Sequence, residues 1–140
     1  MARKKSAPTL TTRTVDAVDE LVTELNTLSG IEWTRDAWVN KAPDNYGVVE
    51  LSGEQKQLWA DGHLIDSSWR VVLTAYVVGD SDEWPALVQA KLEALEASGT
   101  LELVHSATRE FDFQINKVRW QWTVYMYSPL TWTVTEEVTA

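Results

Sequence analysis

The clearest hydrophobic pattern in the chain is a strand-like run from Leu64 to Asp80. β-Branched and aromatic residues dominate it, and it has no proline and no glycine before Gly79, which favours a central β-strand. Successive side chains of a strand point to opposite faces. One face is almost continuously apolar and is expected in the core: Ile65, Trp69, Val71, Leu73, Ala75 and Val77. The other face mixes polar and apolar groups and is expected to contact another subunit: Arg70, Val72, Thr74, Tyr76 and Val78.

Two segments have the periodicity of amphipathic helices. The first begins at Thr14 and is expected to stop at Ser29-Gly30, since glycine commonly ends helices. The second runs from Glu83 or Trp84 to Ala97. Its Pro85 is tolerated only in the first turn, which fixes where the helix starts.

The remaining patterned segments are predicted to be strands and turns. We expect short strands or extended segments at 31–39, 46–51, 57–60, 100–105 and 110–127, a loop at 41–45 and a turn at 52–55. Asp61-Gly62 lies between β-forming residues and predicts a tight hairpin, because both positions must tolerate positive φ. The apolar positions change phase near Asn116-Lys117, so a tight turn or bulge is expected there.

The two ends of the chain lack these patterns. Residues 1–13 have no periodicity and are predicted to be a flexible arm. Pro129 ends the last long strand, and residues 128–140 are expected to be an extended tail that can pair with a neighbour.

Residues 14–127 make up one predicted domain. Since no βαβ alternation occurs, we expect an α+β fold in which an antiparallel (mixed) β-sheet carries two helices on one face.

Composition narrows the functional classes. The absence of cysteine excludes a disulfide scaffold and thiolate metal sites. A net charge of −9 disfavours a general nucleic-acid binder, because affinity for phosphates depends on basic residues, whereas an acidic surface suits DNA that must slide past. No apolar run approaches the roughly 20 residues that span a bilayer, and no apolar segment follows the basic start, so neither an anchor nor a secretory signal is expected.

No group of residues indicates a metal or a cofactor. His63 and His105 have no second histidine at metal-binding spacing and are expected to be exposed or hydrogen-bonded. The acidic loop before the second helix lacks the glycine and the distal glutamate of a calcium site. Its carboxylates are expected to cap the helix instead: Asp80, Asp82 and Glu83.

Catalysis also lacks support in the sequence. No glycine elbow surrounds Ser67, Ser68 or Ser106, and no glycine-rich phosphate cradle precedes a helix. Carboxylate pairs carry little information in a chain with 21 Asp and Glu residues. We therefore expect a protein that is not an enzyme and has no catalytic residues.

Tryptophan is unusually abundant, with eight in 140 residues. Because tryptophan is over-represented at interfaces, this excess favours assembly or ligand contact. Adjacent residues of a strand face opposite sides, so Trp120 and Trp122 are expected to face the core, while Arg119 and Gln121 face out. The alternative is a carbohydrate-binding or adhesion module in which Trp120, Trp122 and Trp132 are exposed and stack on sugar rings.

Several segments resemble the small tail-completion or minor capsid proteins of long-tailed bacteriophages, which are related in fold to the tail terminators. The most specific of them is Leu58-Trp59-Ala60-Asp61-Gly62, just before the central strand. Ala42-Pro43 and Tyr46-Gly47-Val48-Val49 add to the pattern. The resemblance covers about Val15 to Tyr127, while the tryptophan density and the tail after Pro129 depart from the family pattern.

This resemblance implies a structural virion protein of the tail or neck, assembled in the host cytoplasm. It implies a ring, usually a hexamer, that ends the tail tube and joins it to the head-side connector or stopper protein, with genomic DNA passing through the lumen without sequence-specific binding. It implies no cofactor and no membrane. The candidate contacts with neighbouring subunits or partners are Arg70, Val72, Tyr76, Gln55, Trp59 and Trp132.

Overall fold

The structure is a computed structural model that describes residues 9–36, 42–79, 83–103 and 107–138. It has an α+β fold with a mixed sheet, as expected. The elements in chain order are β1 (Thr9–Asp16), α1 (Ala17–Leu25), β2 (Glu32–Arg35), β3 (Tyr46–Ala60), β4 (His63–Val77), α2 (Glu83–Ala97), β5 (Leu101–Leu103), β6 (Thr108–Asp112), β7 (Lys117–Tyr127) and β8 (Thr131–Val138).

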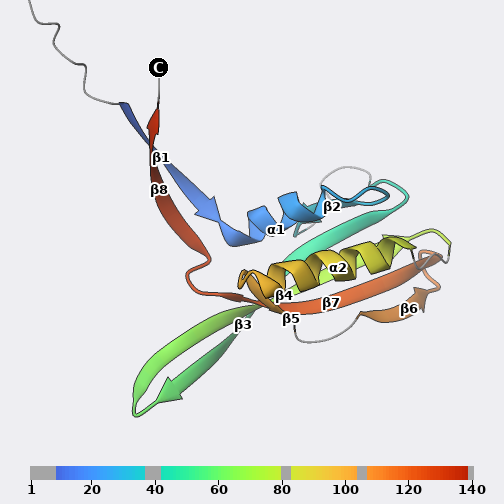
Figure 1. The fold of residues 1–140 in the computed structure, drawn as a ribbon. Coiled ribbons are helices and arrows are strands. Elements are labelled where there is room, and N and C mark those ends of the chain that lie inside the picture. Colours follow the sequence, from blue (N-terminus) through green and yellow to red (C-terminus); the bar gives the residue numbers. More distant parts are fainter. Residues whose placement is uncertain (1–8, 37–41, 80–82, 104–106, 139–140) are drawn as a thin grey trace, which may run out of the picture.

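The larger sheet has the strand order β2-β3-β4-β7-β5, and β6 also pairs with β7. Among these strands β2 and β3 run parallel and the other pairs run antiparallel. Both helices lie on the same side of the sheet (Figure 1). The sheet therefore has one face covered by helices and one face without helix cover.

The core lies between the helices and the covered face. As predicted, β4 contributes Val71, Leu73, Ala75 and Val77, which are all buried. Trp122 of β7 is fully buried, and Trp120 is half-buried beside it. Val18, Leu21 and Leu25 of α1 and Val88 and Leu92 of α2 close the core from above.

The second helix has the predicted boundaries, whereas α1 is shorter than predicted at both ends. It begins at Ala17 instead of Thr14 because residues 14–16 pair with β8 and are extended. It ends at Leu25, and the side chain of Asn26 then bonds to the backbone N–H and C=O of Trp33, at 2.8 and 2.9 Å. These bonds hold the end of α1 against β2.

The hairpin of β3 and β4 extends well beyond the rest of the sheet (Figure 1). Asp61 and Gly62 form its turn with φ of 51° and 75°, which confirms the predicted hairpin. The turn expected at 52–55 is instead a register shift between Leu51 and Gln55 within one continuous strand. We call the projecting part, residues 52–67, the arm.

Ile65 was predicted to lie in the core, and this prediction is wrong. Its side chain is exposed on the arm. The reason is that the neighbouring strand β7 ends at Tyr127, which pairs with Ser68. No third strand or helix among the described residues reaches the outer part of β4, so alternation there no longer separates core from solvent.

The two ends of the chain form a second, two-stranded sheet, which we call the terminal ribbon. β1 and β8 pair antiparallel over their full length, from Thr9 with Val138 to Asp16 with Thr131. Residues 9–13, expected to belong to a flexible arm, are therefore part of a strand, and residues 1–8 lie outside the described residues. The tail after Pro129 therefore pairs with β1 of its own chain, whereas the sequence suggested pairing with a neighbour.

Asp16 fixes the inner end of the terminal ribbon to the body. One carboxylate oxygen accepts hydrogen bonds from the N–H groups of Val18 and Asp19, and the other lies 2.8 Å from Nη1 of Arg35 on β2. Partial burial raises the pKa of Asp16, but these hydrogen bonds and the positive charge of Arg35 outweigh burial and hold the pKa below its ordinary value. The carboxylate is therefore ionised at neutral pH, and the ion pair persists.

Candidate functional site

The sheet face without helix cover carries the β4 residues that the sequence predicts to contact another subunit. Arg70, Val72 and Tyr76 alternate with the core residues and are half-buried on this face. Nη1 of Arg70 lies 3.1 Å from a carboxylate oxygen of Glu54. The rings of Tyr76 and Tyr46 stack with centroids 5.1 Å apart. This face is therefore a mixture of aromatic rings and paired charges, which suits a partly polar protein contact.

Tyr46 connects this stack to a cation. Nζ of Lys117 lies 4.9 Å from the centroid of the Tyr46 ring. Burial raises the pKa of the Tyr46 hydroxyl, and Tyr76 and Asp112 raise it further. The hydroxyl is therefore neutral at physiological pH, and the ring makes the contacts with Tyr76 and Lys117.

The arm carries two of the other candidates, Gln55 and Trp59. Nε1 of Trp59 donates to Oε1 of Gln57 at 3.3 Å, and Nε2 of Gln57 donates to Oε1 of Gln55 at 3.2 Å. Gln55 pairs with Trp69, which points away from the face that carries Arg70. The arm candidates thus form a surface separate from the one around Arg70.

Four large apolar side chains of the arm are between 48% and 61% exposed. They are Leu58, Trp59, Leu64 and Ile65. An isolated two-stranded hairpin is only marginally stable in water, and its outer edges offer unpaired backbone groups. Exposed apolar side chains at this density are typical of a surface that another protein covers.

Trp132 lies on the terminal ribbon, away from both of these surfaces. Its ring lines an apolar pocket of about 70 Å³ on the body. Leu21 of α1, Leu95 of α2 and Met126 of β7 also line this pocket. Trp132 therefore lies across this pocket from residues of both helices, and part of its side chain is exposed.

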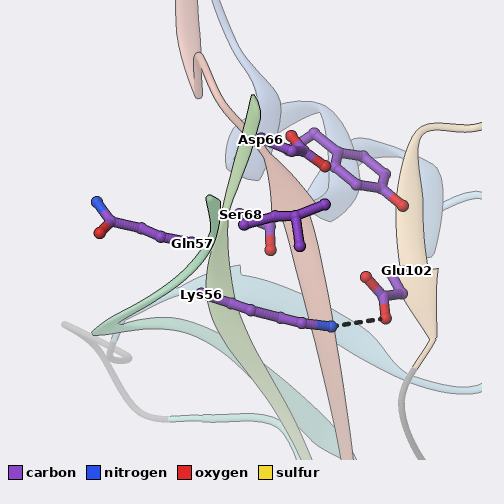
Figure 2. Close-up of a pocket in the computed structure, with 7 residues that line it drawn as sticks. Lys56, Gln57, Asp66, Ser68 and Glu102 are labelled. Carbon is purple, nitrogen blue, oxygen red and sulfur yellow. Dashed lines mark hydrogen bonds and ion pairs between the residues drawn. The ribbon is translucent and has the colours of Figure 1, made fainter. Parts of the chain in front are cut away.

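A shallow pocket of about 200 Å³ lies at the base of the arm (Figure 2). Lys56 reaches across it, and its Nζ lies 3.1 Å from a carboxylate oxygen of Glu102 on β5, whereas Gln57 points away (Figure 2). Ser68 lines the pocket, but no histidine stands among the lining residues to activate its hydroxyl. The main polar feature of this pocket is the Lys56–Glu102 ion pair, which connects the arm to β5 of the sheet.

The remaining predicted residues are separate from one another. His63 is exposed next to the hairpin turn, and Glu83 is the exposed first residue of α2. Asp80, Asp82, His105 and Ser106 lie outside the described residues, so the expected capping of α2 does too. Within the described ranges, no three His, Asp or Glu residues are grouped closely enough to hold a metal ion. Neither helix is long and apolar enough to cross a membrane.

The exposed arm residues Leu58, Leu64 and Ile65 were missed by the sequence prediction. A signal for them is present, because Leu58-Trp59 and Leu64-Ile65 are adjacent apolar pairs on either side of the turn. Adjacent apolar residues on a strand point to opposite faces, so one face alone cannot bury them.

No protein-family model matches the chain, and no curated protein matches it either.

Proposed function

We propose that the chain is a structural virion protein that assembles into a ring, usually six-fold, at the end of a phage tail tube. In this role it joins the tube to the head-side connector or stopper protein and lets genomic DNA pass. The resemblance of the hairpin segment 58–62 to the tail-completion proteins motivates the proposal. The observation that carries it is the projecting arm, whose apolar side chains have no cover within the described part of the chain.

The arrangement of surfaces supports an assembly role over a reaction. The sheet face around Arg70 continues into the arm through the Arg70–Glu54 ion pair, and the terminal ribbon is a further surface. A subunit of a ring needs at least two different surfaces for its two neighbours. The tail tube and the connector lie above and below the proposed ring and require further contacts. We assign these contacts to the terminal ribbon. The net charge of −9 suits a lumen that DNA traverses without binding.

The carbohydrate-binding alternative has less support from the geometry. Stacking on sugar rings requires a row of exposed tryptophans. In the structure Trp122 is fully buried and Trp120 is half-buried beneath α2. Trp59 and Trp132 are exposed but lie on the arm and the ribbon respectively. The adjacent rings of Trp120 and Trp122 face the core, so these residues form no exposed platform of indole rings.

Electron microscopy of the protein mixed with tail tubes tests the proposed function. The tubes are assembled from the tube protein of the same virus, and purified connector is added in a parallel sample. We expect extra density at one end of each tube and attachment of the connector only when the chain is present. Unchanged tube ends at excess protein, together with no binding to the connector, would contradict the proposal. An unrelated acidic protein of similar size is the control.

A further inference from the structure

We propose that the arm of one subunit packs against the β6–β7 end of the next subunit, in a head-to-tail contact that closes the ring. We call this end, residues 108–119, the aromatic end. This inference rests on the proposed ring and identifies the surfaces that build it. The partner of the arm is therefore a second copy of this chain.

The aromatic end carries exposed apolar side chains of its own. Phe113 is 87% exposed, and its ring contacts that of Phe111 edge to face with centroids 4.8 Å apart. Ile115 is also exposed in the same turn. Asn116, with φ of 54°, then starts the return into β7. Alternation along residues 111–115 does not bury these side chains, because β7 is the one strand that pairs with β6 among the described residues.

The two apolar surfaces lie at opposite ends of the molecule. Along β4, Ser68 pairs with Tyr127 next to the arm, and Val77 pairs with Val118 next to the aromatic end. At about 3.3 Å per residue, Ile65 and Val77 are roughly 40 Å apart along the strand. Figure 1 shows the arm and β6 at opposite sides of the body. This placement suits a heterologous contact, in which two different patches on each subunit meet and a rotation closes the ring.

The charges of the two surfaces are complementary. Residues 52–67 of the arm contain three carboxylates and one lysine: Glu54, Asp61, Asp66 and Lys56. Residues 108–119 contain three cations and two carboxylates: Arg109, Lys117, Arg119, Glu110 and Asp112. Arg119 forms an ion pair with Glu110, and Lys117 is held by the carbonyl oxygen of Asp44. On the arm, Glu54 and Lys56 pair with Arg70 and Glu102 of the same chain. The net charges of the two segments have opposite signs, −2 for the arm and +1 for the aromatic end, which favours the heterologous contact over pairing of two arms.

Two variants that each remove one side of this contact test the inference. Trp59→Ser with Ile65→Asn alters only the arm, and Phe113→Ser with Ile115→Asn alters only the aromatic end. Because these side chains are exposed in the isolated chain, the changes are expected to leave the fold of each subunit intact. Leu87→Ser, an exposed apolar position on α2, is the matched control.

Light scattering then gives the mass of each protein and of their mixture. We expect wild type and Leu87→Ser to form the ring, and each double variant alone to have the mass of one subunit, 15.8 kDa. An equal mixture of the two double variants is expected to form a dimer and nothing larger, because one intact arm still meets one intact aromatic end.

Other outcomes separate this inference from the proposed function. Rings that persist in either double variant, or a mixture that stays monomeric, would overturn the arm-to-end contact while leaving the ring in place. Dimers of the aromatic-end variant alone would show that arms pair with each other, and would overturn it too. A wild-type chain that never oligomerises would overturn both the contact and the ring.

Discussion

Replacing Trp122 with alanine is expected to lower the free energy of unfolding by about 3–5 kcal/mol, the range for a large aromatic residue removed from a core. Trp122 is fully buried, and the rings of Trp33, Trp84 and Trp120 lie within 6.4 Å of its own, centroid to centroid. Its Nε1 also donates to Oε1 of Gln89 on α2 at 3.0 Å. The substitution therefore removes packing from both layers and leaves the Gln89 side chain without this donor.

Urea unfolding of wild type and of the Trp122→Ala variant measures this loss. Leu87→Ala is the control, since it removes an apolar side chain from an exposed position outside the proposed contacts and is expected to change stability by only about 0.5 kcal/mol. A Trp122→Ala variant with wild-type stability would show that this indole is not a core residue. If that variant also lost binding to a glycan, the carbohydrate hypothesis would replace the present one.

Gly47→Ala is expected to destabilise the protein by about 3 kcal/mol, the upper part of the range for overpacking a core. A Cβ at position 47 would lie 2.2 Å from Cε3 of Trp33, far inside the contact distance of two carbons. The Trp33 ring cannot move away easily, because its backbone N–H and C=O are both held by the side chain of Asn26. Pairing of β2 with β3 places Trp33 directly beside Gly47.

The same substitution in a Trp33→Leu background separates this clash from other effects of losing a glycine. With the indole gone, the cost of Gly47→Ala is expected to fall to about 0.5 kcal/mol, which gives a coupling of roughly 2–3 kcal/mol between the two positions. Urea unfolding of the four proteins in this double-mutant cycle supplies the measurement. Equal costs of Gly47→Ala in both backgrounds would show that the Trp33 ring does not restrict position 47.

Local signals in the sequence were enough for the parts of the fold that depend on neighbouring residues. The positive φ of Asp61 and Gly62 and the position of Pro85 in the first turn of α2 agree with the expected hairpin and helix. The turn ending at Asn116 was likewise placed correctly by the phase change of the apolar residues. In each case the residue types restrict the backbone directly.

Features that depend on distant residues were not predictable in the same way. β1 is a strand because β8, more than a hundred residues later, pairs with it. This pairing also shortened α1, since residues 14–16 fit both a helical and an extended pattern and the partner strand decided between them. Burial of one face of β4 followed from alternation, but where that burial stops depended on the length of β7.

The candidate site shows the same division. Alternation correctly separated Arg70, Val72 and Tyr76 from the core residues. It did not indicate that Trp59 stands on a projecting arm, or that Trp132 lines a pocket beside the two helices. Those positions depend on where other strands end, which no short stretch of sequence encodes.

Assembly into a ring is tested most directly by the mass of the purified wild-type chain, measured by light scattering over a wide range of concentration. We expect one closed species of several subunits, six by the family resemblance, which electron microscopy resolves as a ring with a central opening. A mass of 15.8 kDa at every concentration, with no ring in the images, would contradict the central proposal.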